Sequence, residues 1–351
     1  MEKLLTFVVP VYNTEKYVIR ALSSMISNKA NVVVVDDGSK DNSLSVIKEF
    51  TKTKPNFTVI HTENRGAMAA RREGLKYVET EYFALVDSDD IINTDAYIKL
   101  AKKLKEVRYT VGVGRSSVTL PNSNIPFHSK KWKKEELDFL INKKDFSNTS
   151  CTFWSKIFHS SCIPYFMADS KQLVYEDMEF VYYALAKERF MFHTNDILYQ
   201  YCMRGSLQGS TSSNGLSMLS DKGLRGILGA STSMQNKFQK DNLYLEYHNE
   251  LDAITIKLIY QRIYSLLTNP NIKNKKEMAT YILNILSSYL PNWQENKYFK
   301  EGFKGSELND YLFYLLASNI LKILRINIYT EPTKDYQTLL DEYNEKLVLK
   351  K

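Results

Sequence analysis

Hydrophobic positions in the first hundred residues fall into short runs separated by longer periodic stretches. The short runs have the length and apolar character of buried strands, and they cover residues 4–11, 31–35, 57–61 and 82–86. The stretches between them place apolar residues at helical spacing and cover residues 14–27, 43–51 and 66–78. Strands that alternate with helices of this length predict βαβ units and a mainly parallel sheet, which is an α/β fold.

The middle of the chain gives a weaker pattern. A helix is predicted over residues 173–187, followed by two short strands over residues 190–192 and 197–201. Residues 204–214 are rich in serine and glycine, which predicts a mobile loop.

The periodicity becomes purely helical after about residue 216. Apolar stripes predict helices over residues 243–268, 276–290, 306–325 and 333–349, with no strand between them. A chain of 351 residues has room for two domains. We therefore expect an α/β domain over residues 1–215 and an α-helical domain over residues 216–351. The second domain would serve acceptor binding, dimerisation into a homo-oligomer, or docking on a membrane or partner.

The composition is that of a globular protein, because 44% of the residues are hydrophobic and 25% are charged. Three cysteines, Cys151, Cys162 and Cys202, are too few for a disulfide framework and indicate a reducing compartment. The apolar run near the N-terminus is too short for a signal peptide or a membrane-spanning helix, and no later run is long enough. We therefore expect a cytoplasmic protein, and a peripheral position on the inner face of the membrane stays open.

The net charge of +7 is concentrated in one segment. Residues 101–156 contain 12 Lys and Arg against 5 Asp and Glu, an excess of seven. Two interpretations stay open: a solvated helical face, or a patch that faces an anionic acceptor or an anionic lipid surface. No nucleic-acid-binding motif accompanies the charge, so we expect no nucleic-acid partner.

Acidic residues cluster where the predicted strands end. Asp36 and Asp37 follow the second strand, and Asp87, Asp89 and Asp90 follow the fourth. Ligands of an open parallel sheet bind at the carboxyl ends of its strands, so these side chains are expected along one rim. Clustered carboxylates repel one another unless a cation joins them, and oxygen ligands suit Mg²⁺ or Mn²⁺, which also bind phosphates. The pattern predicts a site for a metal-bound nucleotide diphosphate.

Taken together, these motifs resemble the nucleotide-sugar glycosyltransferases of family two, which have the GT-A fold. The resemblance covers residues 3–212. It is carried by the segments Phe7–Asn13, Val35–Ser43, Asn64–Gly66, Ala70–Arg71, Gly74–Leu75, Leu85–Asp90, Trp154–Phe158 and Tyr175–Phe180.

The resemblance implies a role for each matching residue. Val11 and Tyr12 would flank the nucleotide base, and either Asp36 or Asp37 would accept from its ring N–H. Asp89 would ligate the divalent ion, and Asp87 would contact the ribose or the same ion. The full implied donor-binding set is Pro10, Val11, Tyr12, Asp36, Asp37, Arg71, Asp87, Ser88 and Arg204.

The resemblance also implies the chemistry. Asp177 is the candidate general base and Glu176 the alternative, because an acceptor hydroxyl needs a carboxylate to take its proton. One direct displacement on a nucleotide-diphosphate sugar, with a UDP-sugar favoured, would invert the anomeric carbon. Arg204 would fold over the diphosphate, or would lie in an ordinary surface loop.

The expected enzyme is a metal-dependent inverting hexosyl- or N-acetylhexosaminyltransferase that uses Mn²⁺ or Mg²⁺. Its acceptor would be a glycan, a glycolipid or an anionic polymer, in cell-surface polysaccharide or cell-wall synthesis. The alternative is a non-catalytic nucleotide-sugar or carbohydrate-binding protein that keeps the fold. A sugar nucleotidylyltransferase is disfavoured, because Pro10–Asn13 stands where that chemistry needs a glycine-rich phosphate loop.

Overall fold

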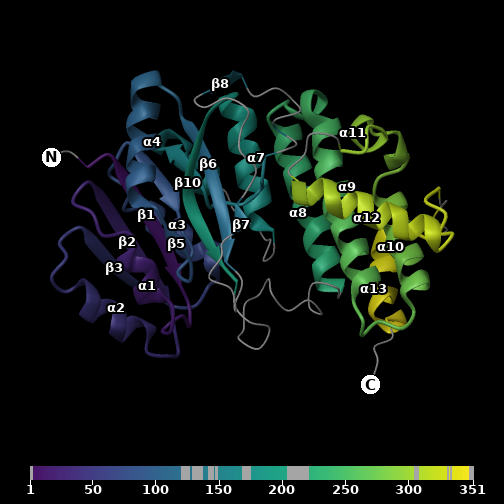
Figure 1. Cartoon of the computed structure of the whole chain (residues 1–351), viewed down its shortest axis with the longest axis horizontal. Helices are drawn as coiled ribbons and strands as arrows, with labels where there is room; N and C mark the ends of the chain where they lie inside the picture. The colour runs from purple at the N-terminus through teal and green to yellow at the C-terminus, as the bar shows by residue number, and fades with distance from the viewer. Residues whose placement is uncertain are drawn as a thin grey trace. The chain divides into compact units, whose positions relative to one another are not determined.

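The computed structural model shows the chain as two compact units (Figure 1). The first comprises Met1–Ile141, Cys151–Leu173 and Phe180–Gly205, and the second comprises Asn142–Ser150, Val174–Glu179 and Ser206–Lys351. The structure describes residues 3–119, 127–128, 137–140, 146, 149–167, 175–203, 221–303, 308–329, 332 and 334–347.

The first unit is built on a sheet whose first four strands are parallel. They are β1 (Leu5–Val11), β2 (Ala30–Asp37), β3 (Phe57–Thr62) and β4 (Tyr82–Leu85), and they lie side by side in the order β3-β2-β1-β4. The valine run of β2 is buried because the strand has a neighbour on each edge and packs on both faces. The predicted α/β fold with a mainly parallel sheet is confirmed.

The sheet continues beyond β4 with strands of mixed direction. β9 (Lys156–His159) is antiparallel to β4 and to β6 (Val111–Thr119), and β6 is parallel to β10 (Phe190–Cys202). Three short strands complete it: β5 (Ile91–Ile92), β7 (Phe127–His128) and β8 (Leu137–Leu140).

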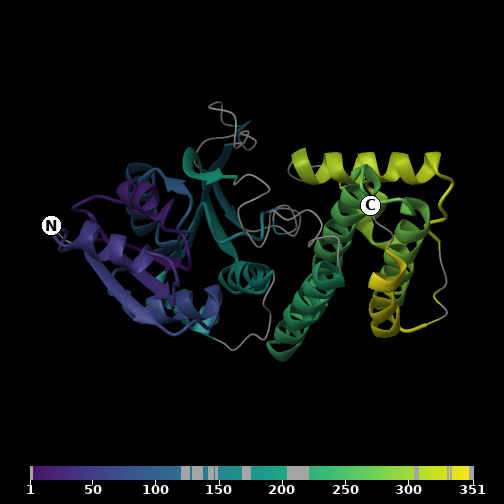
Figure 2. The same cartoon turned by 90° about the horizontal axis from the view of Figure 1, so that it is seen from below.

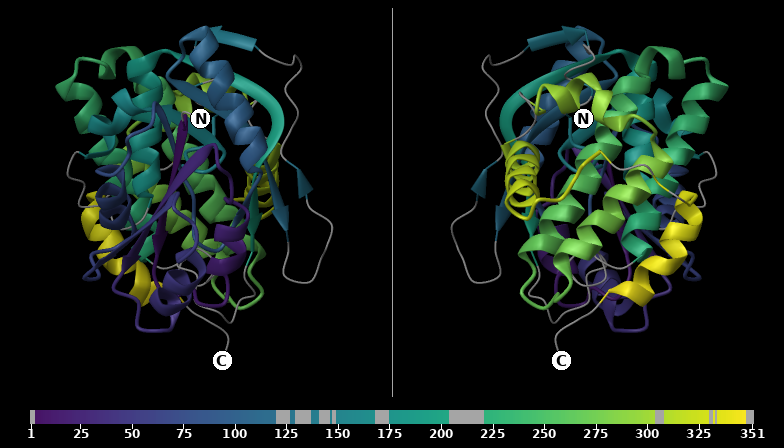
Figure 3. Two further views of the ribbon diagram at one scale, coloured as in Figure 1. Left: turned by 90° about the vertical axis from the view of Figure 1, so that its left-hand side faces the viewer. Right: turned by 90° about the vertical axis from the view of Figure 1, so that its right-hand side faces the viewer.

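The prediction of two separate strands over residues 190–201 is wrong, because β10 is continuous. The pairing register of β10 with β6 shifts between His193 and Ile197 and again between Ile197 and Tyr199. Such irregularities bend a strand without ending it, and Figure 3 shows β10 curving across the sheet.

Helices cover both faces of this sheet. The helices of the first unit are α1 (Val18–Ser23), α2 (Ser43–Thr51), α3 (Ala67–Leu75), α4 (Thr94–Val107), α6 (Ile163–Met167), most of α7 (Glu176–Glu188), and the 3₁₀ turn η1 (Ser160–Cys162). Val18, Ile47 and Leu100 from α1, α2 and α4 share one apolar core with β1 and β2. α3 packs on the opposite face, against Val8 and Val35.

One predicted helix is longer than the observed one, and one observed helix was not predicted. The helix expected over residues 14–27 is confined to α1, because the Thr14 N–H donates to the Ser43 hydroxyl (2.9 Å) and residues 14–17 form a turn instead. The basic helix α4 was not predicted. Lys102 and Lys105 of α4 and Arg108 directly after it are exposed, which both interpretations of the charge expect, while Lys130, Lys131, Lys133 and Lys134 lie outside the described residues.

The second unit is helical throughout its described residues. Its helices are α8 (Asp221–Lys240), α9 (Tyr244–Thr268), α10 (Lys275–Tyr289), α11 (Lys297–Lys300), α12 (Leu308–Ile323), α13 (Tyr336–Lys346) and the 3₁₀ turn η2 (Trp293–Glu295). α9 is the longest helix and is contacted by α8, α10, α11 and α12, with α12 running crosswise to its neighbours (Figure 2). None of the described helices is long and apolar enough to cross a bilayer.

Close packing of α3 on the sheet requires a glycine. A Cβ on Gly74 would stand 2.5 Å from Cγ1 of Val8 and 3.1 Å from Cγ2 of Val35. We predict that Gly74→Ala lowers the free energy of unfolding by about 1–3 kcal/mol, since β1 or α3 must shift. Urea denaturation checks this. Lys76→Ala, which removes an exposed ion pair beside the same helix, should stay within about 0.5 kcal/mol, and equal effects would contradict the packing argument.

A buried histidine in the sheet gives a pH prediction. His193 is 1% exposed, and burial, with a smaller effect from Lys156, lowers its pKa to about 4. The unfolded chain binds this proton near pH 6.5 and the folded chain does not, so stability should fall as the pH drops from about 6.5 towards 4. Thermal unfolding of the wild type and of His193→Gln at stepped pH measures this. A variant whose stability falls as steeply as that of the wild type would contradict it.

Candidate active site

The strand order predicts a ligand crevice at the carboxyl ends of β1 and β4. The chain steps outward from β1 to β2 to β3 and then returns to the other side of β1, so the order reverses at the β1–β4 pair. Ligands of open α/β sheets bind at the carboxyl ends of strands at such a reversal. Here the loops that follow β1 and β4 are joined directly, because the Thr14 hydroxyl donates to the Ser88 hydroxyl at 3.1 Å.

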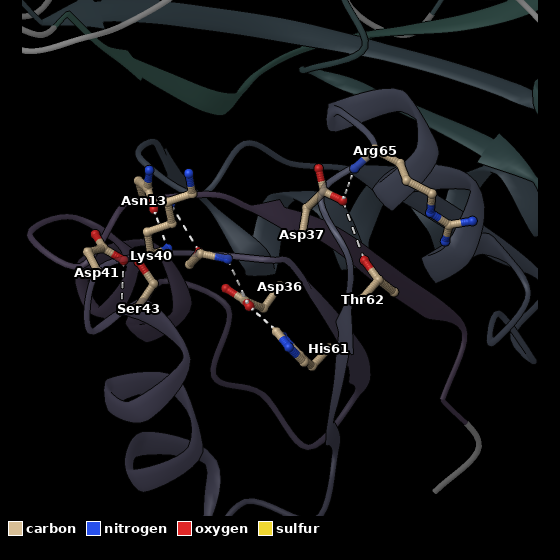
Figure 4. A network of polar contacts seen from close by, with 10 residues as sticks. Asn13, Asp36, Asp37, Lys40, Asp41, Ser43, His61, Thr62 and Arg65 are labelled. Atoms are coloured by element: carbon tan, nitrogen blue, oxygen red, sulfur yellow. Dashed lines mark hydrogen bonds and ion pairs between the residues drawn. The ribbon is translucent and has the colours of Figure 1, made fainter.

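The loops after β1 and β2 are tied to each other (Figure 4). The Asn13 N–H donates to the Ser39 hydroxyl (3.0 Å), and the Lys40 N–H donates to the Asn13 side-chain oxygen (2.8 Å). Gly38 makes the second loop possible: its φ is +68°, and a Cβ there would stand 2.8 Å from the Asn64 nitrogen. The short polar residues after these strands therefore fix one rim of the crevice.

Asp36 and Asp37 have separate partners. Asp36 is fully buried, and its Oδ2 lies 2.8 Å from Nδ1 of His61, while its Oδ1 has no hydrogen-bond partner among the described residues. Asp37 instead accepts the N–H group of Arg65 at 3.0 Å (Figure 4) and that of Gly66 at 2.8 Å, which fixes the start of α3. The unsatisfied oxygen of Asp36 favours that residue as an acceptor for a ligand N–H, and the assignment to the base stays a prediction.

A buried arginine holds the first aspartate after β4. Arg71 on α3 is 7% exposed, and its Nη2 donates to Oδ1 of Asp87 at 2.8 Å. The guanidinium group lies 5.0 Å from the ring centroid of Phe153. Arg71 thus fixes one oxygen of Asp87, and the half-exposed carboxylate remains at the crevice.

A second set of contacts, which we call the clamp, holds the acidic turn Asp87–Asp90. The Asp87 N–H donates to the Tyr199 hydroxyl (3.2 Å), which donates to Oδ2 of Asp90 (2.7 Å). The Cys202 N–H donates to Oδ1 of the same carboxyl (2.7 Å). The Trp154 ring stacks on Tyr199 with centroids 5.4 Å apart. These contacts join the β4 turn to the end of β10.

Asp90 differs from its neighbours because it is fully buried. Burial, and then the nearby charges of Asp87 and Asp89, raise the pKa of this carboxyl to about 8. A group that is hard to ionise and already bonded on both oxygens suits a structural role rather than ligand binding.

The other residues implied for the donor site lie around the same crevice. Tyr12 is 42% exposed, Val11 and Ser88 are buried, and Asp89 is half-buried. The Asp89 carbonyl accepts from Nη2 of Arg20 at 2.8 Å, which fixes the backbone of the turn. The first unit therefore brings together all the predicted donor residues except Arg204, which lies outside the described residues.

Glu176 and Asp177 belong to the second unit. Both stand in the first turn of α7, and the Met178 N–H donates to Oδ1 of Asp177 at 3.0 Å. A helix N-terminus favours an ionised carboxylate. Their role as general base stays a prediction.

Sequence reasoning missed two members of the site, Tyr199 and His61, and the bond between Tyr199 and Asp90. Tyr199 and Asp90 form their bond across 109 residues of sequence, so no local pattern could reveal it. No motif singled out His61, whose contact with Asp36 orients a candidate ligand group. Asp90 was expected on the acidic rim, but its full burial could not be predicted from its neighbours in sequence.

The carboxylates of the acidic turn fit a divalent ion that is already bound to the phosphates of a nucleotide. Within the described residues, no group of three or more Asp, Glu, His or Cys side chains could hold a metal alone. An ion that is also ligated by a diphosphate needs only one or two protein carboxylates. Asp89, with the outer oxygen of Asp87, is such a set.

A comparison with family models decides the class of this unit. Residues 6–163 match the model of Glycosyl transferase family 2. This segment is a family 2 glycosyltransferase domain. The match includes the strands β1–β4 and the whole acidic turn, so the resemblance inferred from the motifs is confirmed for the part that carries the crevice.

Curated relatives of this glycosyltransferase domain act in bacteria. Glycosyltransferase GlyA of Streptococcus pneumoniae is 40% identical over 113 residues, which cover 31% of this chain and 16% of GlyA. The poly(ribitol-phosphate) beta-glucosyltransferase of Bacillus spizizenii is 31% identical over 118 residues, 32% of this chain and 19% of that protein. The chain thus matches only a small part of the length of these relatives.

The solved structures extend the likeness beyond the glycosyltransferase domain. The crystal structure of S. aureus TarS 1–349 has a TM-score of 0.58 and 18% sequence identity, and it covers 97% of this chain and 91% of that one. The complex of the same protein with UDP has a TM-score of 0.55 at the same coverage. At this identity the likeness shows the fold, including a helical region after the sheet.

Removing the Tyr199 hydroxyl tests the clamp on the acidic turn. Tyr199→Phe removes the hydroxyl that bonds Oδ2 of Asp90 and the Asp87 N–H, while the Cys202 N–H still bonds Oδ1 of Asp90, so we predict a stability loss of about 1–3 kcal/mol. The affinity for UDP with Mn²⁺ should also fall roughly tenfold, which is about 1.4 kcal/mol. Tyr82→Phe is the matched control, because it removes a hydroxyl that donates to the Tyr109 carbonyl (3.1 Å) at the other end of β4. It should cost stability without changing the UDP affinity, and a Tyr199→Phe variant with unchanged affinity would refute the clamp.

Proposed function

We propose that this chain is a metal-dependent inverting glycosyltransferase that transfers a hexosyl or N-acetylhexosaminyl residue from a UDP-sugar to a polymer hydroxyl. One observation carries the proposal: a family 2 glycosyltransferase domain holds Asp87 and Asp89 at the strand-order reversal, in a turn fixed by Arg71 and Tyr199. The choice of UDP is supported by TarS, a protein of the same fold whose crystal structures include complexes with UDP and with UDP-GlcNAc.

The donor would lie across the ends of β1 and β4. Tyr12 and the buried Val11 would face the base, with the free oxygen of Asp36 accepting its ring N–H. Asp89 and Asp87 would hold Mn²⁺ or Mg²⁺, which when bound neutralises the charge that develops on the leaving diphosphate. Arg71 keeps Asp87 in place for this task.

The transfer step needs one further group from the chain. The acceptor oxygen forms a bond to the anomeric carbon while the bond from that carbon to the diphosphate oxygen breaks, so the configuration inverts. Asp177 takes the proton of the acceptor hydroxyl, and Glu176 is the alternative base. The N-terminal turn of α7 favours the ionised form of Asp177 that this role requires.

The acceptor we propose is a hydroxyl of an anionic cell-wall polymer. The poly(ribitol-phosphate) beta-glucosyltransferase of Bacillus spizizenii is named for a polyanion, and it is 31% identical to this chain over 118 residues. Exposed Lys102 on α4 and Arg108 directly after that helix offer positive charge toward a polyanion or an anionic membrane surface, whereas Lys105 forms an ion pair with Glu81.

Loss of the base should abolish turnover without abolishing binding. We predict that Asp177→Asn lowers kcat by roughly 10²–10⁴-fold, while the affinity for the UDP-sugar is retained. Asp95→Asn is the control, because Asp95 is an exposed aspartate in the first turn of another helix, α4. A transfer assay that detects the release of UDP gives both values. An Asp177→Asn variant that turns over like the wild type would rule out Asp177 as the base.

The acidic turn should make nucleotide binding depend on the metal. We predict that Mn²⁺ strengthens UDP binding to the wild type and that Asp89→Ala removes most of this gain, because one carboxylate ligand is lost. Calorimetric titration of UDP with Mn²⁺ and with EDTA measures the difference. Equal UDP affinity under both conditions in the wild type would refute a metal-bridged donor.

A further inference from the structure

The segment that carries the candidate base is packed as part of the helical unit. Val174–Glu179 belongs to the second unit, although the rest of α7 belongs to the first. Tyr175 packs against the apolar core of the helical unit, and the Arg262 guanidinium group of α9 lies 5.7 Å from the centroid of its ring. The start of α7 is therefore held by α8 and α9 as well as by its own helix.

Glu179 makes the polar part of this attachment. Its side chain is 4% exposed, and its Oε2 accepts a hydrogen bond from the Ser233 hydroxyl at 2.7 Å. Its Oε1 lies 3.8 Å from Nζ of Lys237, which stands one turn further along α8. A carboxylate in such a buried position persists only when it is paired and hydrogen-bonded. Both conditions are met here by residues of one helix.

This attachment fixes the backbone next to Asp177. Side chains two positions apart on a helix point in different directions, so Glu179 can be anchored in the helical unit while Asp177, which is half-buried, points elsewhere. Asp177 and Glu179 share the first turn of α7, so any shift of the Glu179 anchor moves Asp177 with it. General-base catalysis is sensitive to such shifts, because a displacement of 1 Å can cost about 100-fold in rate.

We propose that Glu179, Ser233 and Lys237 form a positioning cluster through which the helical unit sets the place of the general base. None of the three is assigned a contact with the substrate; they act through Asp177. This inference rests on the proposed function and adds to it a catalytic task for the helical unit. The unit would then be needed for turnover even with an acceptor that it does not bind.

The helix α8 offers a matched pair of serines for the test. Ser233→Ala removes the hydrogen bond to Glu179, whereas Ser231→Ala removes a fully buried hydroxyl that bonds Thr255 of α9 at 2.8 Å. We expect Ser233→Ala to lower kcat roughly tenfold with the KM for the UDP-sugar unchanged. Ser231→Ala should lower the melting temperature but leave kcat within about twofold of the wild type.

A double-mutant cycle separates positioning from a general structural role. In an Asp177→Asn background the base is already absent, so adding Ser233→Ala should cause no further loss of the residual rate. Glu179→Gln keeps an acceptor for Ser233 but loses the charge that pairs with Lys237, so its kcat should fall less than that of Glu179→Ala.

The outcomes are distinguishable. A Ser233→Ala variant with wild-type kcat, or a loss of the same size in Ser231→Ala, would overturn the positioning cluster, as would a full additional loss in the Asp177→Asn background. A wild-type protein that transfers sugar from no UDP-sugar would instead contradict the proposed function itself.

Discussion

The site depends on the way in which one turn of four residues, Asp87–Asp90, is held against electrostatic repulsion. Arg71 neutralises the first carboxylate at 2.8 Å, while Tyr199 and the Cys202 N–H bind the last one. The buried Asp90 avoids a second full charge, because burial raises its pKa to about 8. Asp89 and the outer oxygen of Asp87 are then the candidate ligands of a cation in this turn.

This arrangement explains why the first unit is built as it is. The parallel strands β1, β2 and β4 bring their polar carboxyl ends to one edge, and the reversal of strand order opens a crevice there. β10 is long and bent because Tyr199 and Cys202 near its end must reach the acidic turn while its beginning pairs with β8. The close packing of α3 on the sheet at Gly74 also serves the site, because the same helix carries Arg71.

Much of the first unit could be predicted from the sequence, and the reasons are local. The strands β1 to β4 appear as short apolar runs, and polar residues that a strand interior disfavours mark their ends, such as Asn13 after β1 and Asp36 near the end of β2. Contacts between distant segments gave no such signal: the bond between Asp90 and Tyr199 joins residues 109 positions apart. The helix α8 was missed because its glycines and small polar residues are poor helix formers, and the core of the helical unit, in which Leu224 and Leu228 are buried, overrides that preference. The attachment of Glu179 to α8 could not be predicted either, because α8 itself was not predicted.

The central claim is that the crevice between β1 and β4 holds a cation-bridged nucleotide. A crystal of the protein grown with UDP and Mn²⁺ tests it most directly, with the manganese located by its anomalous scattering. We expect one manganese ion beside Asp89, bridging to the diphosphate, with the uracil ring between Tyr12 and Asp36. Nucleotide bound elsewhere on the protein, or manganese without any contact to Asp87 or Asp89, would contradict the account.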